Sequence, residues 1–249
     1  EVDCEGPDNC KLKDEFLGYP DPRPYRTFAN IRYALYEYWL TYYTDRSYIL
    51  ILDFRDTFFQ RDPFEHLGPV HKRSVVYDLQ VFAENWKVKK LGKCVYNSLW
   101  LGRCFGRDQL EPLKENAVIC SGSTMGSLPG IYHYVRTMLT AMDRVKCWLK
   151  NIESDQGYQN YLFYNGHFDT KYGNATIHHQ GTGVVNTIGA MNGFRVPAHM
   201  KGPLDTHWKI RDKDGYLLNN DGTRSACVHQ WDRFFAELHK WVDSKLYKK

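Results

Sequence analysis

The stretch from Tyr48 to Phe64 constrains the fold more than any other. Five apolar or aromatic residues, Tyr48 to Leu52, are followed directly by the charged segment Asp53-Phe54-Arg55-Asp56. A continuous apolar run bounded by charge is typical of a strand buried on both faces of a mostly parallel sheet. Ligands of such sheets bind beyond the carboxyl ends of the strands. We therefore expect an α/β fold with Asp53 and Asp56 at the binding edge of a central sheet.

The rest of the chain predicts one domain. Its 249 residues are enough to bury a full core. Residues 1–24 show no periodicity and predict an irregular arm, so we place a single domain at 25–249. Segment 175–186 has two apolar runs around Gly-Thr-Gly and predicts an antiparallel hairpin. We expect helices at 27–42, 86–105, 131–149, 154–164 and 231–247, and strands at 48–52, 74–82, 117–120 and 226–229.

Helical spacing of apolar residues assigns a buried face to three of these helices. Thr27 and Ser154 are expected to cap two helices at their N-termini. The expected faces comprise Phe28, Ile31, Leu35, Trp39 and Tyr42; then Ile131, Tyr134, Val135, Met138, Met142, Val145 and Leu149; and finally Phe234, Phe235, Leu238, Trp241, Val242 and Leu246.

The cysteine pattern indicates an oxidising compartment. None of the seven cysteines forms a C-x-x-C pair, which argues against a structural zinc site. Two closely spaced pairs, Cys4 with Cys10 and Cys94 with Cys104, are typical of disulfides in secreted proteins. The odd count leaves at least one free thiol, which we expect to be Cys120.

Charge and targeting signals narrow the function classes further. The formal net charge of +4 is small and the cations are scattered, which argues against nucleic acid as a partner. Asn174-Ala175-Thr176 is an acceptor sequence for N-glycosylation. No signal peptide or membrane span is visible, and the first residue, Glu1, indicates that an upstream segment has been removed.

The two carboxylates after the apolar run are candidate metal ligands. Residues three apart in a strand point to opposite faces, so Asp53 and Asp56 converge only if the chain turns after Leu52. Paired carboxylates are ligands for Mg²⁺ or Mn²⁺, which can bridge to a diphosphate. The alternative is that Asp56 pairs with Arg55 or Arg61, or caps the next turn.

Three further places carry candidate site residues, each with an ordinary structural explanation beside it. Segment 121–127 is rich in small residues after a strand and could cradle phosphate, but it lacks the P-loop lysine and also fits a plain connecting loop. Asp155 and Gln156 open a helix, where an aspartate complements the helix dipole. His229 ends a short strand, and a lone histidine is more often a hydrogen-bonded structural residue than a ligand.

The order of these motifs resembles a known family. The segments LDFRDTFFQRDPF, ICSGSTMG, SDQGYQNYLF, GVVNTIG and VHQWDRF occur in the same order as in eukaryotic nucleotide-sugar glycosyltransferases of the GT-A type. The chain is most similar to the plant and algal group with the acid motif D-x-R-D-x-x-F-Q-x-D-P-F. The resemblance covers about Arg26 to Phe235. It implies a GT-A, Rossmann-like fold in which helices flank a mostly parallel sheet.

The resemblance also implies roles for individual residues. The acidic motif implies that Asp53 and Asp56 hold the donor ribose and a divalent ion, Mn²⁺ or Mg²⁺, with His229 completing the metal site. Ser121 and Gly122 would line the sugar side, together with Arg55 at a donor phosphate. Catalytic roles at the acceptor side fall to Asp155 and Gln156. The implied partners are a UDP- or GDP-sugar donor and a glycan or glycoprotein acceptor.

Two departures from the family pattern leave alternatives open. Arg55 stands where the usual D-x-D motif has its second aspartate, so either Asp53 or Asp56 could contact the metal. The first strand of a GT-A fold has no counterpart here, and a missing upstream segment could carry it together with a membrane anchor. We expect an enzyme of the Golgi or secretory-pathway lumen, either free in the lumen or anchored as a type II membrane protein. The alternative is a non-catalytic carbohydrate- or nucleotide-binding module.

Overall fold

The computed structural model describes residues 2–6, 9–12, 25–69, 72–73, 75–145, 147, 155–191, 211–233 and 236–246. The helices are α1 (Phe28–Leu40), α2 (Val95–Phe105), α3 (Arg107–Leu110), α4 (Leu128–Arg144), α5 (Asp155–Tyr164) and α6 (Ala236–Leu246). The strands are β1 (Val2–Cys4), β2 (Cys10–Leu12), β3 (Tyr48–Leu52), β4 (Thr57–Phe59), β5 (Leu79–Ala83), β6 (Ile119–Ser127), β7 (Thr176–His178), β8 (Val185–Thr187) and β9 (Cys227–His229).

The expected mostly parallel, Rossmann-like sheet of a GT-A fold is wrong. The described strands form three small sheets with the orders β1-β2, β3-β6-β5-β7 and β4-β9-β8. Strand β6 runs antiparallel to both of its neighbours, β3 and β5. Parallel pairing is confined to β5 with β7 and β8 with β9 among the described strands. The chain is an α/β protein built on small, mostly antiparallel or mixed sheets.

Strand β3 lies at the edge of its sheet and not at the centre. All five of its residues are half-buried, because only β6 pairs with it. The centre is taken by β6, whose small residues led us to expect a loop at 121–127. Ser123 and Thr124 are fully buried there. Small residues allow close packing, since a Cβ on Gly126 would lie 2.3 Å from the carbonyl oxygen of Asp78.

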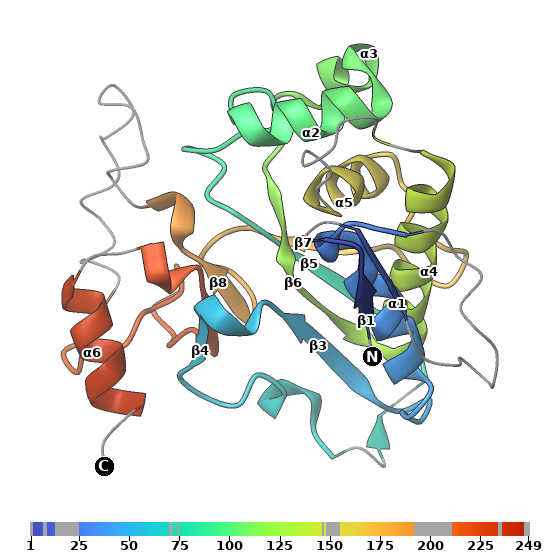
Figure 1. Ribbon diagram of the computed structural model, residues 1–249. Coiled ribbons are helices and arrows are strands. Elements are labelled where there is room, and N and C mark those ends of the chain that lie inside the picture. Colours follow the sequence, from blue (N-terminus) through green and yellow to red (C-terminus); the bar gives the residue numbers. More distant parts are fainter. Residues whose placement is uncertain are drawn as a thin grey trace.

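Four of the helices pack in two of the hydrophobic clusters that the described residues form. Helices α1, α4 and α5 lie together beside the four-stranded sheet (Figure 1). Their contact region is the main core, which includes Ile31, Tyr134 and Met138. Helix α6 lies on the other side of the molecule (Figure 1), where Val242 packs with Phe58 beneath the three-stranded sheet.

The hairpin expected at 175–186 is wrong. Its two runs do form strands, β7 and β8, but they do not pair with each other. Strand β7 adds to β5 in the four-stranded sheet, and β8 adds to β9 in the three-stranded sheet. Local turn signals predicted a local pairing, whereas each strand pairs with a partner distant in the sequence.

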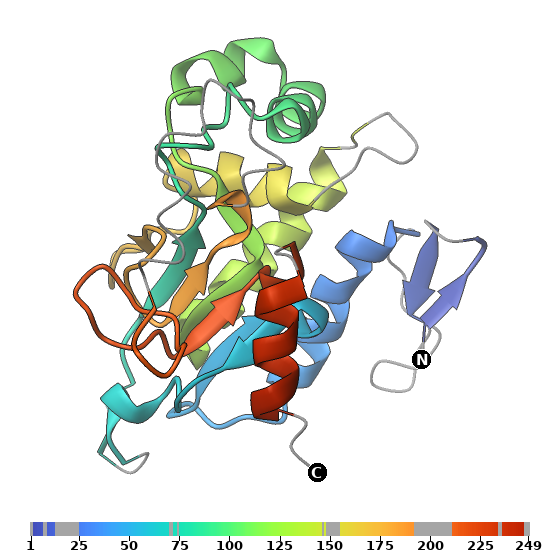
Figure 2. The same cartoon turned by 90° about the vertical axis from the view of Figure 1, so that its left-hand side faces the viewer.

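The N-terminal arm contains a hairpin where we expected irregular structure. Strands β1 and β2 pair antiparallel and are joined by the expected Cys4–Cys10 disulfide. Figure 2 shows this hairpin beside α1, where Cys10 and Leu12 join the main core.

The second disulfide differs from the expected pair. Cys104 bonds to Cys147, and Cys94 is free. Cys94 and Cys104 stand at opposite ends of α2, so their Cα atoms are about 15 Å apart at 1.5 Å per residue, which is too far for a disulfide. The free thiol expected at Cys120 is confirmed, and Cys227 is free as well.

The helix starts agree in part with the sequence. Thr27 occupies the N-cap of α1, although its side chain makes no capping hydrogen bond. Helix α4 begins at Leu128, earlier than expected, and the Ser127 hydroxyl accepts from the Gly130 amide at 3.3 Å. Ser154, expected to cap α5, lies outside the described residues, as do parts of the expected strand at 74–82 and helices at 131–149 and 231–247. Within the described ranges, no helix combines the length and apolar character needed to cross a membrane.

Candidate metal centre

Asp53, Asp56 and His229 converge at one point. Each offers one ligand atom, and these atoms all lie within 4.8 Å of one another. The chain leaves β3 at Asp53 and enters a short 3₁₀ turn over Phe54–Asp56. Residues three apart are eclipsed in such a turn, whereas they point to opposite faces in a strand. The turn therefore directs both carboxylates to the same place.

Strand pairing brings His229 to the carboxylates. Strand β4 follows the turn directly and pairs antiparallel with β9, which sets Thr57 opposite His229. The next residue, Gln230, donates its backbone N–H to the carbonyl of Asp56 at 2.7 Å. Gln230 has φ 62°, a left-handed conformation that costs a non-glycine residue free energy. This strained turn fixes the position of His229 against Asp56.

Two buried atoms of this group lack a well-formed hydrogen bond. Asp56 is 6 % exposed and His229 is 1 % exposed. Asp56 Oδ1 and His229 Nε2 lie 3.4 Å apart, beyond ordinary hydrogen-bond length, and neither has another partner among the described residues. Leaving buried polar atoms unpaired is costly. A divalent cation would satisfy both, and a set of two carboxylates and one imidazole suits Mn²⁺.

The charges of the two residues are coupled. Burial alone would raise the pKa of Asp56, but the contact with His229 and the charge of Arg233 lower it below its ordinary value. Burial opposes protonation of His229, yet the Cys120 sulfur and Asp56 raise its pKa to about 10. Without a metal ion, His229 is therefore a cation held against the Asp56 carboxylate. An incoming ion has to replace that proton.

Gly122 makes room for the group. Its carbonyl accepts from the Asp53 N–H at 2.8 Å. A Cβ at this position would lie 2.5 Å from Asp53 Oδ2 and 2.6 Å from His229 Cε1. Only glycine therefore fits between the two ligand side chains. The prediction that Gly122 lies near Asp53 is correct, but Gly122 belongs to the antiparallel strand β6 and not to a loop.

Arg32 joins the carboxylates of two distant segments, and sequence reasoning missed it. Its Nη1 donates to Asp53 Oδ1 at 2.6 Å, and its Nη2 forms an ion pair with Asp155 Oδ2. The carboxylates raise the pKa of Arg32 against the opposing effect of burial. Arg32 lies within a helix, and no local pattern marks its partners, which are 21 and 123 residues away in the sequence.

Asp155 is buried beside the metal group with both oxygens engaged. Its Oδ1 accepts from the Ser121 hydroxyl at 3.1 Å, and its Oδ2 accepts from the Tyr33 hydroxyl at 3.2 Å in addition to Arg32. This buried contact raises the pKa of Tyr33 well above its ordinary value, with burial as the larger cause. Asp155 and Ser121, to which the resemblance assigns separate site roles, thus lie together.

Gln156 lies next to this network. Its Oε1 accepts from the Ser121 amide at 3.3 Å, and its Nε2 donates to Asn97 Oδ1 on α2 at 2.9 Å. The predicted residues Ser121, Asp155 and Gln156 are therefore linked by direct hydrogen bonds.

Arg55 is the predicted residue that stands apart. Its side chain is 90 % exposed and reaches Asp232 only at 3.9 Å. Arg61, the other basic residue considered as a partner of Asp56, pairs instead with Glu65. The alternative in which Asp56 pairs with Arg55 or Arg61 is therefore wrong.

A cavity of about 440 Å³ adjoins the group. Gln156 and Gln230, the chain neighbours of Asp155 and His229, form part of its wall. No local sequence pattern indicated this cavity, because its wall comes from segments between residues 84 and 233.

Comparison of the chain with protein-family models, with curated proteins and with solved structures finds no match. The choice of function therefore depends on the site residues themselves.

Proposed function

We propose that this chain is a metal-dependent glycosyltransferase, which moves a sugar from a nucleoside-diphosphate donor to a glycan or glycoprotein acceptor. One observation carries the proposal: Asp53, Asp56 and His229 converge within 4.8 Å. Buried and unpaired ligand atoms on Asp56 and His229 support the same reading. The order of the sequence motifs, which resembles nucleotide-sugar glycosyltransferases, adds the substrate class.

The three proposed ligands differ in whether their oxygen or nitrogen atoms already bond to other protein groups. Asp56 and His229 hold a Mn²⁺ or Mg²⁺ ion through atoms that have no other well-formed partner. Asp53 divides its oxygens between Arg32 on one side and the ion or the donor ribose on the other. A bound divalent ion supplies charge neutralisation for the leaving nucleoside diphosphate.

The remaining donor contacts come from exposed or small residues. Arg55 has an exposed guanidinium that can reach a donor phosphate as a fork of N–H donors. Ser121 and Gly122 border the ion site along β6, and the absence of a side chain at Gly122 leaves room for the Asp53 and His229 ligands. These contacts support the binding of a UDP- or GDP-sugar.

Asp155 acts on the reacting sugar as a buried negative charge in this proposal. A general base needs an oxygen free to accept a proton from the acceptor. Both Asp155 oxygens accept hydrogen bonds from protein groups, and Arg32 holds one of them in an ion pair. A fixed carboxylate of this kind suits stabilisation of positive charge on the sugar, while Gln156 orients the acceptor.

The same observation favours a second candidate, a non-catalytic nucleotide- or carbohydrate-binding module. Because both Asp155 oxygens accept hydrogen bonds from Ser121, Tyr33 and Arg32, such a module binds a donor but has no general base for the acceptor. The two candidates differ in one result. An enzyme releases or transfers sugar in the presence of Mn²⁺, whereas a module binds the nucleotide sugar and returns it intact.

The two disulfides are typical of an extracytoplasmic or secreted protein. We place the enzyme in the Golgi or secretory-pathway lumen, where glycan acceptors are made. Asn174 is exposed and can accept an N-glycan itself.

The test is a calorimetric titration of the chain with UDP and with GDP, once with Mn²⁺ present and once with chelator present. The wild-type chain is expected to bind one of the nucleotides at least tenfold more tightly with Mn²⁺ than with chelator. Asp56→Asn, which keeps the side-chain shape and removes the charge, is expected to lose that difference. Circular dichroism checks that the variant is folded. Nucleotide binding that ignores both Mn²⁺ and the substitution would remove the basis of the proposal.

A further inference from the structure

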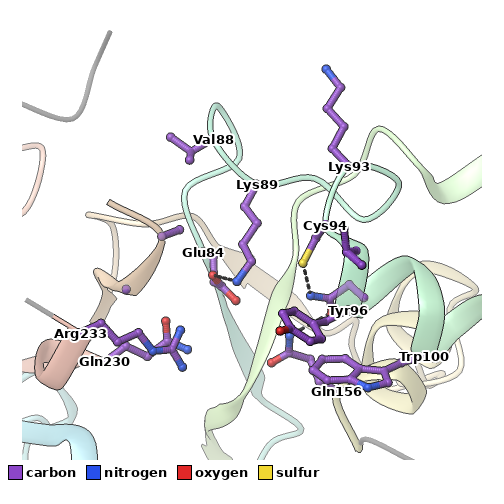
Figure 3. Close-up of a pocket in the computed structure, with 14 residues that line it drawn as sticks. Glu84, Val88, Lys89, Lys93, Cys94, Tyr96, Trp100, Gln156, Gln230 and Arg233 are labelled. Atoms are coloured by element: carbon purple, nitrogen blue, oxygen red, sulfur yellow. Dashed lines mark hydrogen bonds and ion pairs between the residues drawn. The ribbon is translucent and has the colours of Figure 1, made fainter. Parts of the chain in front are cut away.

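The cavity beside the metal group has the chemistry of a sugar site. We propose that it binds an acidic pyranose, a sugar ring that carries a carboxylate, as the terminal unit of the acceptor. The role of the cavity as an acceptor site rests on the proposed function, whereas sugar binding in the cavity can be tested by itself. Figure 3 shows its walls: Tyr96 and Trp100 on one side, Gln230 and Arg233 on the other, and the Glu84–Lys89 pair between them.

An aromatic surface forms one wall. Tyr96 and Trp100 are one turn apart on α2, with ring centroids 5.8 Å apart and planes tilted by 32°. Tyr96 is 67 % exposed, so its ring is accessible to a ligand. The C–H face of a pyranose is apolar and packs on rings of this kind, while its hydroxyls remain at the edges.

A glycine allows α5 to pack closely against Trp100. Gly157 on α5 packs beneath it, and a Cβ there would lie 3.0 Å from the Trp100 Cβ. Gly157 also follows Gln156 directly, so one short segment supports the aromatic wall and supplies a polar group to the cavity.

Polar groups suited to hydroxyls line the opposite wall. Gln230 is 3 % exposed, its Nε2 donates to the Cys120 sulfur, and its Oε1 has no partner among the described residues. That oxygen is an unpaired acceptor buried within the wall. Glu84 is 1 % exposed and accepts from Lys89 Nζ at 2.7 Å, which makes it a fixed acceptor at the back of the cavity.

The charges of the wall favour an anion. Three cations line the cavity, Lys89, Lys93 and Arg233, against one carboxylate, Glu84. The Glu84 carboxylate pairs with Lys89, and the Lys93 side chain points away from the aromatic wall (Figure 3), so Arg233 is the cation in excess. Arg233 lines the cavity together with Gln230, the chain neighbour of the proposed metal ligand His229. A carboxylate on the sugar would complement this excess and would place the ring beside the donor site.

The direct test compares methyl glycosides of glucuronic and galacturonic acid with those of glucose and galactose. Binding is measured by saturation-transfer NMR and calorimetry without Mn²⁺ and without nucleotide. At least one acidic glycoside is expected to bind at least tenfold more tightly than its neutral counterpart. Equal affinity for the acidic and neutral members of both pairs would overturn the proposal.

Variants separate the two walls. Tyr96 is exposed, so Tyr96→Ala is expected to fold, and together with Trp100→Phe it should weaken all glycosides severalfold. Arg233→Gln should remove the preference for the acid and leave the neutral affinity unchanged. Trp39→Ala, at a tryptophan on α1 that is 49 % exposed, is the matched control and should change nothing. Acid binding that survives both Tyr96→Ala and Arg233→Gln would place the sugar elsewhere.

This design separates the two proposals. Acid-sugar binding without Mn²⁺-dependent nucleotide binding would support the cavity and contradict the transferase. Nucleotide binding without acid preference would support the donor site and contradict the acidic acceptor.

Discussion

At the scale of single residues, the site depends on Arg32. This side chain is 22 % exposed and bridges Asp53 on one segment to Asp155 on another. Two carboxylates placed so close together repel each other unless a cation lies between them. Arg32 therefore holds the donor side and the acceptor side of the proposed site in fixed positions.

Arg32→Ala is expected to lower the free energy of unfolding by roughly 3–5 kcal/mol, because removing one partner leaves the buried Asp155 charge unpaired. Urea unfolding followed by fluorescence measures the change. Arg55→Ala is the matched control, since its side chain is 90 % exposed, and it should change stability by less than about 0.5 kcal/mol. Equal losses in the two variants would show that the Arg32 bridge is not structural.

His229 predicts a pH dependence of metal binding. Its pKa is raised to about 10, so the proton remains bound across the neutral range and competes with the ion for Nε2. Metal binding releases that proton, and the affinity for Mn²⁺ should therefore rise up to about tenfold per pH unit between pH 6 and 8. Calorimetry in buffers of different ionisation enthalpy measures both the affinity and the proton release. A flat affinity with no proton release would mean that the ion does not bind His229.

At the scale of elements, the sequence predicted most strands and helices but not how they pair. The apolar run at β3 and the helical spacing of α4 were correct, and Ile131, Tyr134 and Met138 are buried as expected. These are local properties of alternation and periodicity. Strand direction is set by long-range pairing, so the antiparallel run of β6 between β3 and β5 could not be predicted locally.

Helix α1 shows a second limit. Its apolar spacing predicted that Phe28, Trp39 and Tyr42 face the core, but they are 70 %, 49 % and 68 % exposed. The buried side includes Tyr33, whose hydroxyl reaches Tyr134 and Asp155. Aromatic residues lie on two faces of this helix, and the face that is buried is the one whose Tyr33 joins the polar network of the site.

The structure brings three of the predicted site residues together although the predicted fold is wrong. Asp53, Asp56 and His229 converge although the sheet is not parallel, because the 3₁₀ turn and the β4–β9 pairing bring them together. What remained hidden were groups whose role depends on distant partners: Arg32, Tyr33 and the strained Gln230.

At the scale of the whole molecule, two disulfides stabilise different regions. Cys104–Cys147 ties the end of α2 to the segment after α4, across a separation of 43 residues. Cys4–Cys10 closes a separation of only 6 residues in the N-terminal hairpin. Longer loops lose more entropy on closure, so the first disulfide restricts the unfolded chain more.

The double variant Cys104→Ser/Cys147→Ser is expected to lose about 4 kcal/mol of unfolding free energy, against about 2 kcal/mol for Cys4→Ser/Cys10→Ser. Urea denaturation of the two variants under the same conditions gives the comparison. Because α2 carries Trp100, the first variant should also weaken glycoside binding in the cavity. A larger loss of unfolding free energy in Cys4→Ser/Cys10→Ser would contradict the conclusion that Cys104–Cys147 is the more stabilising disulfide.

The central claim is that the convergent group supports sugar transfer. The most direct measurement is release of sugar from a panel of UDP- and GDP-sugars, with and without Mn²⁺, by the wild-type chain and by Asp56→Asn. The account predicts release from at least one donor that requires Mn²⁺ and falls at least 100-fold in the variant, as an order of magnitude for removing a charge-stabilising group. Mn²⁺-dependent release that is unchanged in folded Asp56→Asn, or no release of sugar from any donor, would contradict it.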